Sequence, residues 1–175
     1  PNLDEILEKG NAKGCFGTKM RSVIKLANPE GIAAVVAQQF ELGKKIIDAG
    51  LVPIIEPEVD INSPEKKEAE VILKTELLSQ MNQLRESDVI MLKLTLPEEA
   101  NYYADCINHP KCIRVVALSG GYSREEANRR LSENNSMVAS FSRALTEGLQ
   151  AGQTDDEFNS LLNSSIQAIF DASNT

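Results

Sequence analysis

Short apolar segments recur along the chain, each followed by a turn with polar residues and then by a stretch with helical periodicity. The segments are brief and mostly do not alternate with polar residues, which is typical of parallel strands covered on both faces. The order strand, helix, strand, helix predicts an α/β fold with right-handed crossovers. We predict strands over residues 15–20, 52–55, 89–94, 113–118 and 137–141.

Helix start and stop signals lie between these strands. Asn28 and Pro29 have the form of an N-cap followed by a first-turn proline, and Gly50 is a C-terminal signal. The pair Ser63-Pro64 repeats that opening ahead of a second helix. Periodic apolar positions between these signals predict two long amphipathic helices that cover the sheet.

The second half of the chain carries weaker helix signals. Ser123 and Glu126 have capping-box spacing, which predicts a helix over residues 123–131. A helix is also expected through residues 145–149. We expect a final helix, capped by Asp155 or Asp156, to bury one apolar face. The side chains of that face are Phe158, Leu161, Leu162, Ile166, Ile169 and Phe170.

Two architectures fit five successive strand–helix units. One is an open doubly wound sheet, and the other is part of an eight-stranded (β/α) barrel. A barrel typically takes about 250 residues. The chain has 175, so it would hold five of the eight units. Periodicity does not distinguish between the two architectures.

Composition narrows the possible functions. The net charge is −8, which disfavours a nucleic-acid partner and an anionic membrane surface. No apolar run approaches the roughly 18 residues that a membrane span needs. The three cysteines do not form an even disulfide set, so we expect a cytoplasmic protein. His109 is the only histidine and no two cysteines have CxxC spacing, so we expect no zinc site. We expect no cofactor.

Polar residues lie in each predicted strand or just after it. The carboxyl ends of parallel strands form the ligand site in both candidate architectures, so these residues are expected to share one site. In chain order they are Lys19, Arg21, Glu56, Glu58, Lys93, Ser119, Gly120, Gly121, Ser142 and Arg143.

Lys93 lies in the otherwise apolar run 90–97. A lysine in such a place is paired, neutral or functional. Burial and nearby cations, here Lys19 and Arg21, lower the pKa of an amine, and a neutral amine can attack a ketone to form a Schiff base. A structural ion pair with a neighbouring carboxylate explains the residue equally well.

Glu56 and Glu58 follow a strand at alternate positions, so both carboxylates can face one site. A carboxylate in a partly closed apolar site suits general acid/base catalysis. Without Lys93, a solvated loop would be the better interpretation. Where no neighbouring residue suggests chemistry, we prefer the structural interpretation. The segment 65–70 is then a solvated helix face, and His109 is a loop residue. Tyr102-Tyr103 is expected to cover the sheet.

The segment from Ser119 through Gly120 and Gly121 leads into a capped helix. Glycines let the backbone approach a ligand, and the start of the helix offers free N–H groups to an anion. Arg143, next to Ser142, can add a bidentate phosphate contact. A plain tight turn and a surface arginine are the alternatives.

Five segments in this order resemble the bacterial class I fructose-bisphosphate aldolases, and the match runs through essentially the whole chain. They are Phe-Gly-Thr-Lys-Met-Arg-Ser (16–22), Val-Pro-Ile-Ile-Glu-Pro-Glu-Val (52–59), Met-Leu-Lys-Leu-Thr (91–95), Val-Ala-Leu-Ser-Gly-Gly-Tyr-Ser (116–123) and Ala-Ser-Phe-Ser-Arg-Ala-Leu (139–145). The resemblance implies a TIM barrel in which residues 1–175 form one incomplete unit, with strands four to eight.

The resemblance also implies roles for the candidate residues. Lys93 would form the Schiff base with dihydroxyacetone phosphate, and Glu56 would transfer the proton. Glu58 would hold Lys19, a catalytic cation, and Arg21 would bind a substrate phosphate. The ketose C1 phosphate would be bound by Ser119, Gly120, Gly121, Ser142 and Arg143.

The resemblance leaves gaps. The family's first three strands have no counterpart here, including an aspartate of strand one and a lysine of strand three that belong to the site. The carboxyl-terminal tyrosine of the animal enzymes is absent too. Three interpretations follow: a fragment of a full-length aldolase, a chain completed by an amino-terminal partner or as a homo-oligomer, or a short binding relative without activity.

The leading hypothesis is therefore a metal-free glycolytic lyase. It would cleave fructose 1,6-bisphosphate reversibly to dihydroxyacetone phosphate and glyceraldehyde 3-phosphate. A second hypothesis is another Schiff-base aldolase, similar to transaldolase or to deoxyribose-phosphate aldolase. Because Arg21 and Arg143 form separate cationic ends, the bisphosphate is favoured. A third is a phosphosugar-binding or interaction module.

Overall fold

A parallel five-stranded sheet forms the centre of the computed structural model, which describes residues 2–175. Pro1, the first residue of the predicted unit, lies outside the described residues. All five predicted strands are present, the first and last shorter than predicted. In spatial order they are β1 (Gly17–Lys19), β3 (Val52–Ile55), β5 (Ile90–Thr95), β6 (Cys112–Leu118) and β7 (Val138–Ala139).

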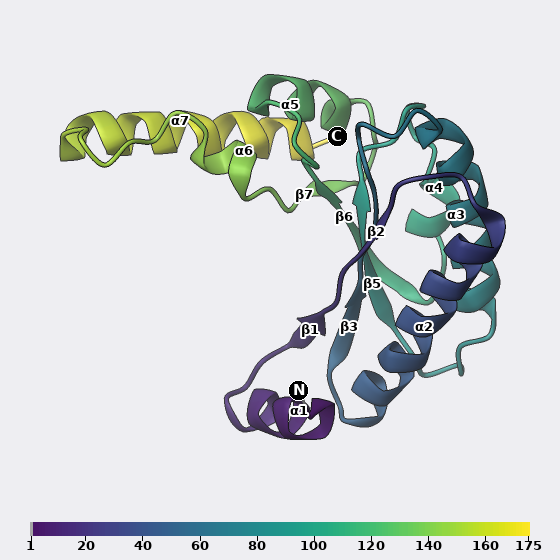
Figure 1. Ribbon diagram of the computed structural model, residues 1–175. Helices are drawn as coiled ribbons and strands as arrows, with labels where there is room; N and C mark the ends of the chain where they lie inside the picture. The colour runs from purple at the N-terminus through teal and green to yellow at the C-terminus, as the bar shows by residue number, and fades with distance from the viewer. Residues whose placement is uncertain (1) are drawn as a thin grey trace.

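Two further strands, β2 (Ser22–Ile24) and β4 (Pro57–Val59), were not predicted. They pair in parallel with each other and continue the directions of β1 and β3 beyond a short interruption (Figure 1). Three-residue strands are too short to show a hydrophobic period. They matter because Glu58 lies in β4 and Arg21 lies directly before β2.

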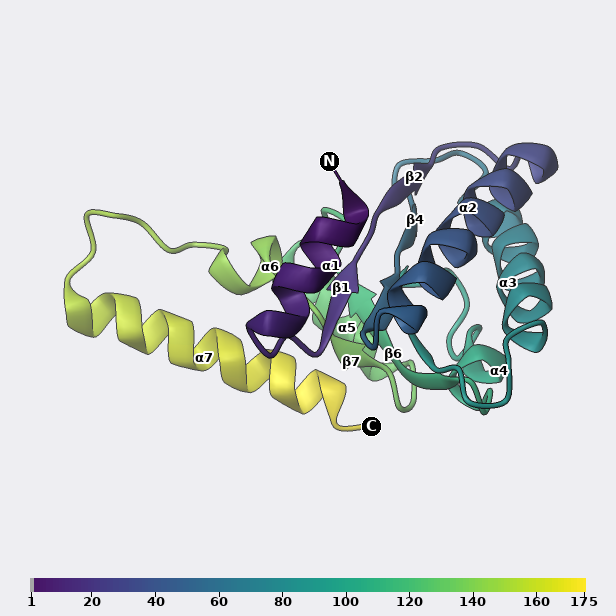
Figure 2. The same ribbon diagram turned by 90° about the horizontal axis from the view of Figure 1, so that it is seen from below.

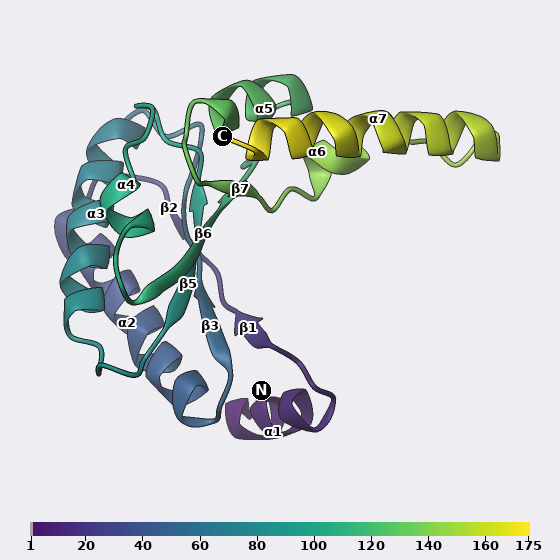
Figure 3. The same cartoon turned by 180° about the vertical axis from the view of Figure 1, so that it is seen from behind.

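Helices cover one face of the sheet. The long helices α2 (Pro29–Asp48) and α3 (Lys66–Asn82) pack side by side on it (Figure 2). The short α4 (Ala104–Ile107) lies beside them. At the other end of the sheet, α5 (Arg124–Ser132), α6 (Arg143–Thr146) and α7 (Asp155–Ser173) pack together. Helix α1 (Leu3–Ala12) and helix α7 project from opposite ends of the sheet towards the same side (Figure 3).

The start of α2 confirms its predicted cap, and the start of α3 does not. The Asn28 side chain accepts a hydrogen bond from the Gly31 N–H at 2.7 Å, and Gly50 takes a left-handed φ of 83° just after the helix. Helix α3 begins at Lys66, and its N-cap residue makes no side-chain hydrogen bond. The prediction that Ser63 and Pro64 begin this helix was therefore wrong. The Ser63 hydroxyl instead accepts a hydrogen bond from the Glu65 N–H within the preceding loop.

Three later helices also differ from the prediction, in a cap or in a boundary. Ser123 accepts from the Glu126 N–H, but the Glu126 carboxylate pairs with arginines, so only half of a capping box forms. Helix α6 ends at Thr146 instead of continuing through residue 149. Helix α7 is capped by Thr154, not by an aspartate, in a complete capping box with Glu157.

The core lies between the sheet and helices α2 to α5, with fully buried side chains from β5, Phe40 of α2 and Tyr103 among them. The predicted apolar face of α7 is only partly covered: Phe170 is 61% exposed and Ile166 48%. Within the described residues, strands β1 and β7 are the edges of the sheet. Five parallel strands that do not close are what a barrel with five of its eight units gives.

In the described part of the chain, no helix combines the length and the apolar character that crossing a membrane would require.

Candidate active site

A cleft of about 320 Å³ lies at the carboxyl ends of the strands. Nine of the ten predicted site residues line it, and Gly121 is the exception. Leu118 and Ser140 complete the lining. The nine predicted residues are Lys19, Arg21, Glu56, Glu58, Lys93, Ser119, Gly120, Ser142 and Arg143.

Glu56, between β3 and β4, joins two lysines. Its Oε2 accepts a hydrogen bond from Lys19 Nζ at 2.6 Å, and its Oε1 lies 3.4 Å from Lys93 Nζ. The glutamate is 3% exposed, so the interpretation as a solvated loop is wrong. A buried carboxylate in contact with two amines can receive a proton from either.

Gln39 of α2 fixes the backbone of Glu56. The Glu56 N–H donates to Gln39 Oε1 at 2.8 Å, and Gln39 Nε2 donates to the Glu56 carbonyl at 3.2 Å. Sequence reasoning missed Gln39, which is itself buried. The available signal was an amide on the apolar face of a predicted helix, between Val36 and Phe40.

Glu58 holds Arg21, with Arg21 Nε donating to its Oε2 at 2.7 Å. This hydrogen bond and the charge of Glu58 raise the pKa of the Arg21 guanidinium. The expectation that Glu58 holds Lys19 was wrong. Strand register gives the reason: Lys19 pairs with Ile54, so its side chain reaches the residue two positions further, which is Glu56.

Lys93 extends from β5 into the cleft with a side chain that is 17% exposed. The ion pair with Glu56 that we considered as a structural explanation is present. The same carboxylate also bonds Lys19, and all three groups face the cleft. Lys93 is therefore paired and still accessible to a small molecule.

Ser119, Gly120 and Gly121 form a tight turn after β6, closed by a hydrogen bond from the Tyr122 N–H to the Ser119 carbonyl. Both glycines have left-handed φ angles, 64° and 117°. A Cβ on Gly120 would lie 2.6 Å from Ile61 Cγ2, so no side chain fits there. The turn is confirmed, and it presents Ser119 and Gly120 to the cleft.

Ser140, Ser142 and Arg143 lie opposite Lys19 along the sheet order, at and after the end of β7. Sequence reasoning missed Ser140, which lies two residues before Ser142 and lines the cleft with it. Arg143 forms no ion pair with a carboxylate among residues 2–175 and is exposed at the cleft.

The cleft carries four cations, Lys19, Arg21, Lys93 and Arg143, against the two carboxylates Glu56 and Glu58. A local positive excess in a chain of net charge −8 favours an anionic ligand. Within residues 2–175, the His, Cys, Asp and Glu side chains form no cluster of three or more suited to a metal ion.

The open parallel sheet with its charged cleft defines a (β/α) barrel with five of the eight units. A crystal structure of fructose-bisphosphate aldolase from Plasmodium falciparum, in complex with TRAP and a small-molecule inhibitor, has the same fold. It superposes with a TM-score of 0.77 at 22% sequence identity, over 98% of this chain and 61% of that one. No family model matches the sequence.

Curated relatives are much closer in sequence. The chain is 62% identical over 175 residues to the class 1 fructose-bisphosphate aldolase of Synechocystis sp., covering 100% of this chain and 58% of that protein. The class 1 enzymes of Porphyromonas gingivalis and Clostridium acetobutylicum are 56% and 55% identical over 99% of this chain, which spans 58% and 59% of their lengths. The chain is thus a homologue of class 1 fructose-bisphosphate aldolases and matches somewhat more than half of their length.

Proposed function

We propose that the chain carries the catalytic lysine and most of the site of a class I fructose-bisphosphate aldolase, as strands four to eight of its barrel. The single observation that carries the proposal is the Glu56 carboxylate in contact with both Lys19 and Lys93 inside a cationic cleft. A ketose bisphosphate fits the charge of this cleft, and the lysine supplies the covalent chemistry.

The reaction begins at Lys93. Its ammonium passes a proton to the Glu56 carboxylate, and the amine then attacks the ketone carbon of fructose 1,6-bisphosphate. Glu56 returns that proton to the departing hydroxyl, so that loss of water gives an iminium and Glu56 is a carboxylate again. The iminium accepts the electron pair of the C3–C4 bond while the C4 hydroxyl gives its proton to the Glu56 carboxylate. Glyceraldehyde 3-phosphate leaves, and an enamine remains. Protonation of that enamine and addition of water release dihydroxyacetone phosphate and restore the lysine.

Two separate cationic ends support a bisphosphate as substrate. Arg21 lies before β2, held by Glu58, while Arg143 lies after β7 beside the Ser119 turn. We assign the C1 phosphate to Ser119, Gly120, Gly121, Ser142 and Arg143, and the second phosphate to Arg21. Lys19, held on Glu56, is the cation nearest to the transferred proton.

Replacing Lys93 by Met tests the proposal. The K93M protein should lose detectable cleavage of fructose 1,6-bisphosphate in a coupled assay, while its affinity for inorganic phosphate, measured by calorimetry, stays within about twofold because the phosphate-binding groups are untouched. K44M, at an exposed lysine of α2, is the matched control. Cleavage that survives in K93M would rule out the covalent mechanism.

A phosphosugar-binding protein without turnover is the second candidate. The unpaired edges of the described sheet and the exposed apolar side chains of α7 favour it, because half a barrel leaves part of a site uncovered. Under this proposal the unaltered chain binds phosphosugars but does not cleave them. A cytoplasmic location and an oligomeric state, or an amino-terminal partner that completes the barrel, stay predictions.

A further inference from the structure

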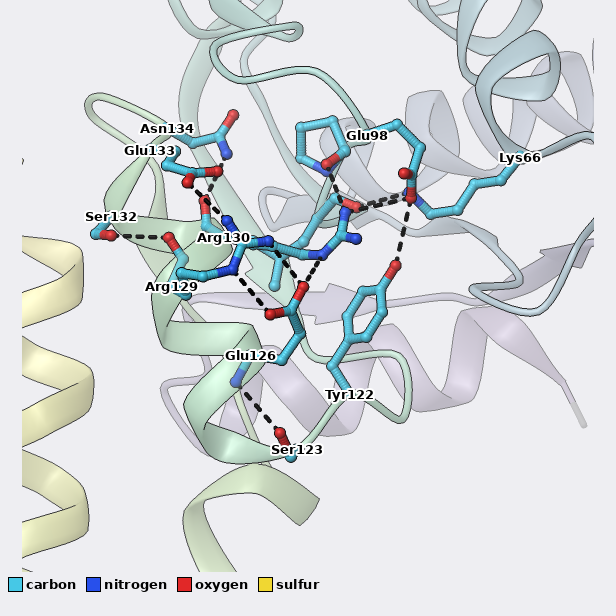
Figure 4. A network of polar contacts seen from close by, with 12 residues as sticks. Lys66, Glu98, Tyr122, Ser123, Glu126, Arg129, Arg130, Ser132, Glu133 and Asn134 are labelled. Carbon is cyan, nitrogen blue, oxygen red and sulfur yellow. Dashed lines mark hydrogen bonds and ion pairs between the residues drawn. The ribbon is translucent and has the colours of Figure 1, made fainter.

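A network of charged side chains behind the cleft joins Lys66 of α3, Glu98 after β5 and Arg130 of α5 (Figure 4). The sequence predicted a solvated helix face at residues 65–70 of this network. Lys66 and Glu70 of α3 are both buried and pair with each other. The sequence-based interpretation of residues 65–70 was wrong for these two, because an i,i+4 charge pair looks the same on an exposed and on a buried face.

Lys66 connects α3 to the segment that follows β5. Its Nζ donates to the Leu96 carbonyl at 2.8 Å and lies 3.0 Å from Glu98 Oε1. The Glu98 N–H donates to Glu70 Oε2 at 3.0 Å. Burial raises the pKa of Glu98, but the hydrogen bonds and charges of Lys66 and Arg130 together outweigh it, so that the pKa is lowered. The end of β5 is therefore anchored a few residues beyond Lys93.

Arg130 of α5 reaches the same segment from the other side. Its Nη1 donates to the Pro97 carbonyl and to Glu98 Oε1, each at 3.2 Å, and its Nε donates to Glu126 at 2.7 Å. Its guanidinium carbon also lies 4.5 Å from the centroid of the Tyr122 ring. A guanidinium that is only 17% exposed gains more from such stacking than an exposed one.

Tyr122 directly follows the glycine turn of the cleft. Its hydroxyl donates to Glu98 Oε1 at 3.4 Å (Figure 4), and burial raises its pKa to about 12, so it stays a neutral donor. Its N–H closes the turn on Ser119. The Tyr122 side chain thus ties the turn after β6 to the segment after β5.

We infer that Arg130 is a positioning residue, which fixes the Gly120-Gly121 turn relative to the Lys93 strand by stacking on Tyr122 while it holds Pro97 and Glu98. Arg130 is not among the residues that line the cleft. The inference rests on the proposed phosphate binding by that turn. It predicts that phosphate affinity depends on Arg130, whereas Schiff-base formation at Lys93 does not.

The test is a titration with inorganic phosphate, followed by NMR at the Gly120 and Gly121 amides. R130M should weaken phosphate binding by about tenfold, since it loses a cation–π contact and charge-assisted hydrogen bonds. R129M is the matched control, because Arg129 shares the Glu126 carboxylate but contacts neither Tyr122 nor Glu98 in the described residues. It should bind phosphate like the unaltered chain.

A second readout separates positioning from general loosening. Borohydride trapping of unphosphorylated dihydroxyacetone on Lys93 should be equal in R130M and in the unaltered chain, while trapping of dihydroxyacetone phosphate at low concentration should fall. R130K should recover part of the phosphate affinity. If R130M does not fold, Y122L tests the same contact from the other side and should show the same selective loss.

Equal phosphate affinity in R130M and the unaltered chain would overturn the inference, as would a parallel loss of trapping for both ketones. Absence of any phosphate response at Gly120 and Gly121 in the unaltered chain would overturn it too. The proposed lyase activity fails on a different result, the absence of a Lys93 adduct.

Discussion

The two charge clusters of the molecule differ in how completely their members are paired. In the network behind the cleft, Lys66 has three partners and Arg130 spans four groups, all on neighbouring elements. In the cleft, Lys19 and Lys93 share one carboxylate, and Arg143 has none among the described residues. Charged groups whose hydrogen-bonding capacity is fully used stabilise the fold. Charged groups with free donors at an open surface are available to a ligand.

One lysine of each cluster differs from the other in burial as well. Lys66 is 5% exposed, whereas the side chain of Lys19 is 44% exposed. An ion pair out of water depends on every partner, because removal of one leaves the other charge buried and unpaired. A pair at the surface loses little when it is broken. The two clusters should therefore respond to mutation in opposite ways, one in stability and the other in chemistry.

The largest expected effect is on chemistry in the cleft. E56Q removes the proton acceptor between Lys19 and Lys93, and we expect the rate of ketose cleavage to fall by about 10²- to 10⁴-fold. Single-turnover kinetics measure it, and E68Q, at an exposed glutamate of α3, is the control. A loss below about tenfold would show that Glu56 does not carry the proton.

The next effect is on stability. K66M leaves Glu70 buried without its partner, so we expect the free energy of unfolding to fall by about 3–5 kcal/mol. K19M should lose less than about 1 kcal/mol, because Glu56 keeps Lys93 and the lost side chain is 44% exposed. Urea denaturation compares the two. Equal losses would contradict the division between the clusters.

The smallest expected effect is on the pKa of Glu126, at the exposed side of the network. Hydrogen bonds from Arg129 and then Arg130 lower the pKa of Glu126 from 4.5 to about 2. Since the folded pKa lies below the unfolded one, this contribution to stability is complete above about pH 4.5 and is lost as the pH falls towards 2. NMR titration of the Glu126 carboxyl should find the low value, and R129M should raise it. A titration midpoint of Glu126 near pH 4.5 in the unaltered chain would show that the two arginines do not pair with it.

The sequence predicted the cleft better than the network because the two carry different signals. Strand ends are marked by a change from apolar to polar residues, and parallel topology brings them to one edge. Nothing local marks Lys66, whose partners Leu96 and Glu98 lie about thirty residues away in the chain. Helix existence was predicted from periodicity, whereas caps such as Thr154 depend on hydrogen bonds that several neighbouring polar residues could have made.

The sequence predicted which cations and carboxylates share the site, but not which cation pairs with which carboxylate. Which lysine or arginine meets which glutamate depends on strand register, and β2 and β4 were too short to predict. A shift of two residues would bring Lys19 to Glu58 and take Arg21 away from it. The composition of a site at strand ends is therefore easier to predict than its internal contacts.

The most direct test of the central claim is borohydride reduction of the chain in the presence of dihydroxyacetone phosphate, followed by peptide mass mapping. We predict a single stable adduct, on Lys93, with none on Lys19 although both contact Glu56. An adduct on another lysine, or no adduct at all, would contradict the assignment of Lys93 as the Schiff-base lysine of this chain.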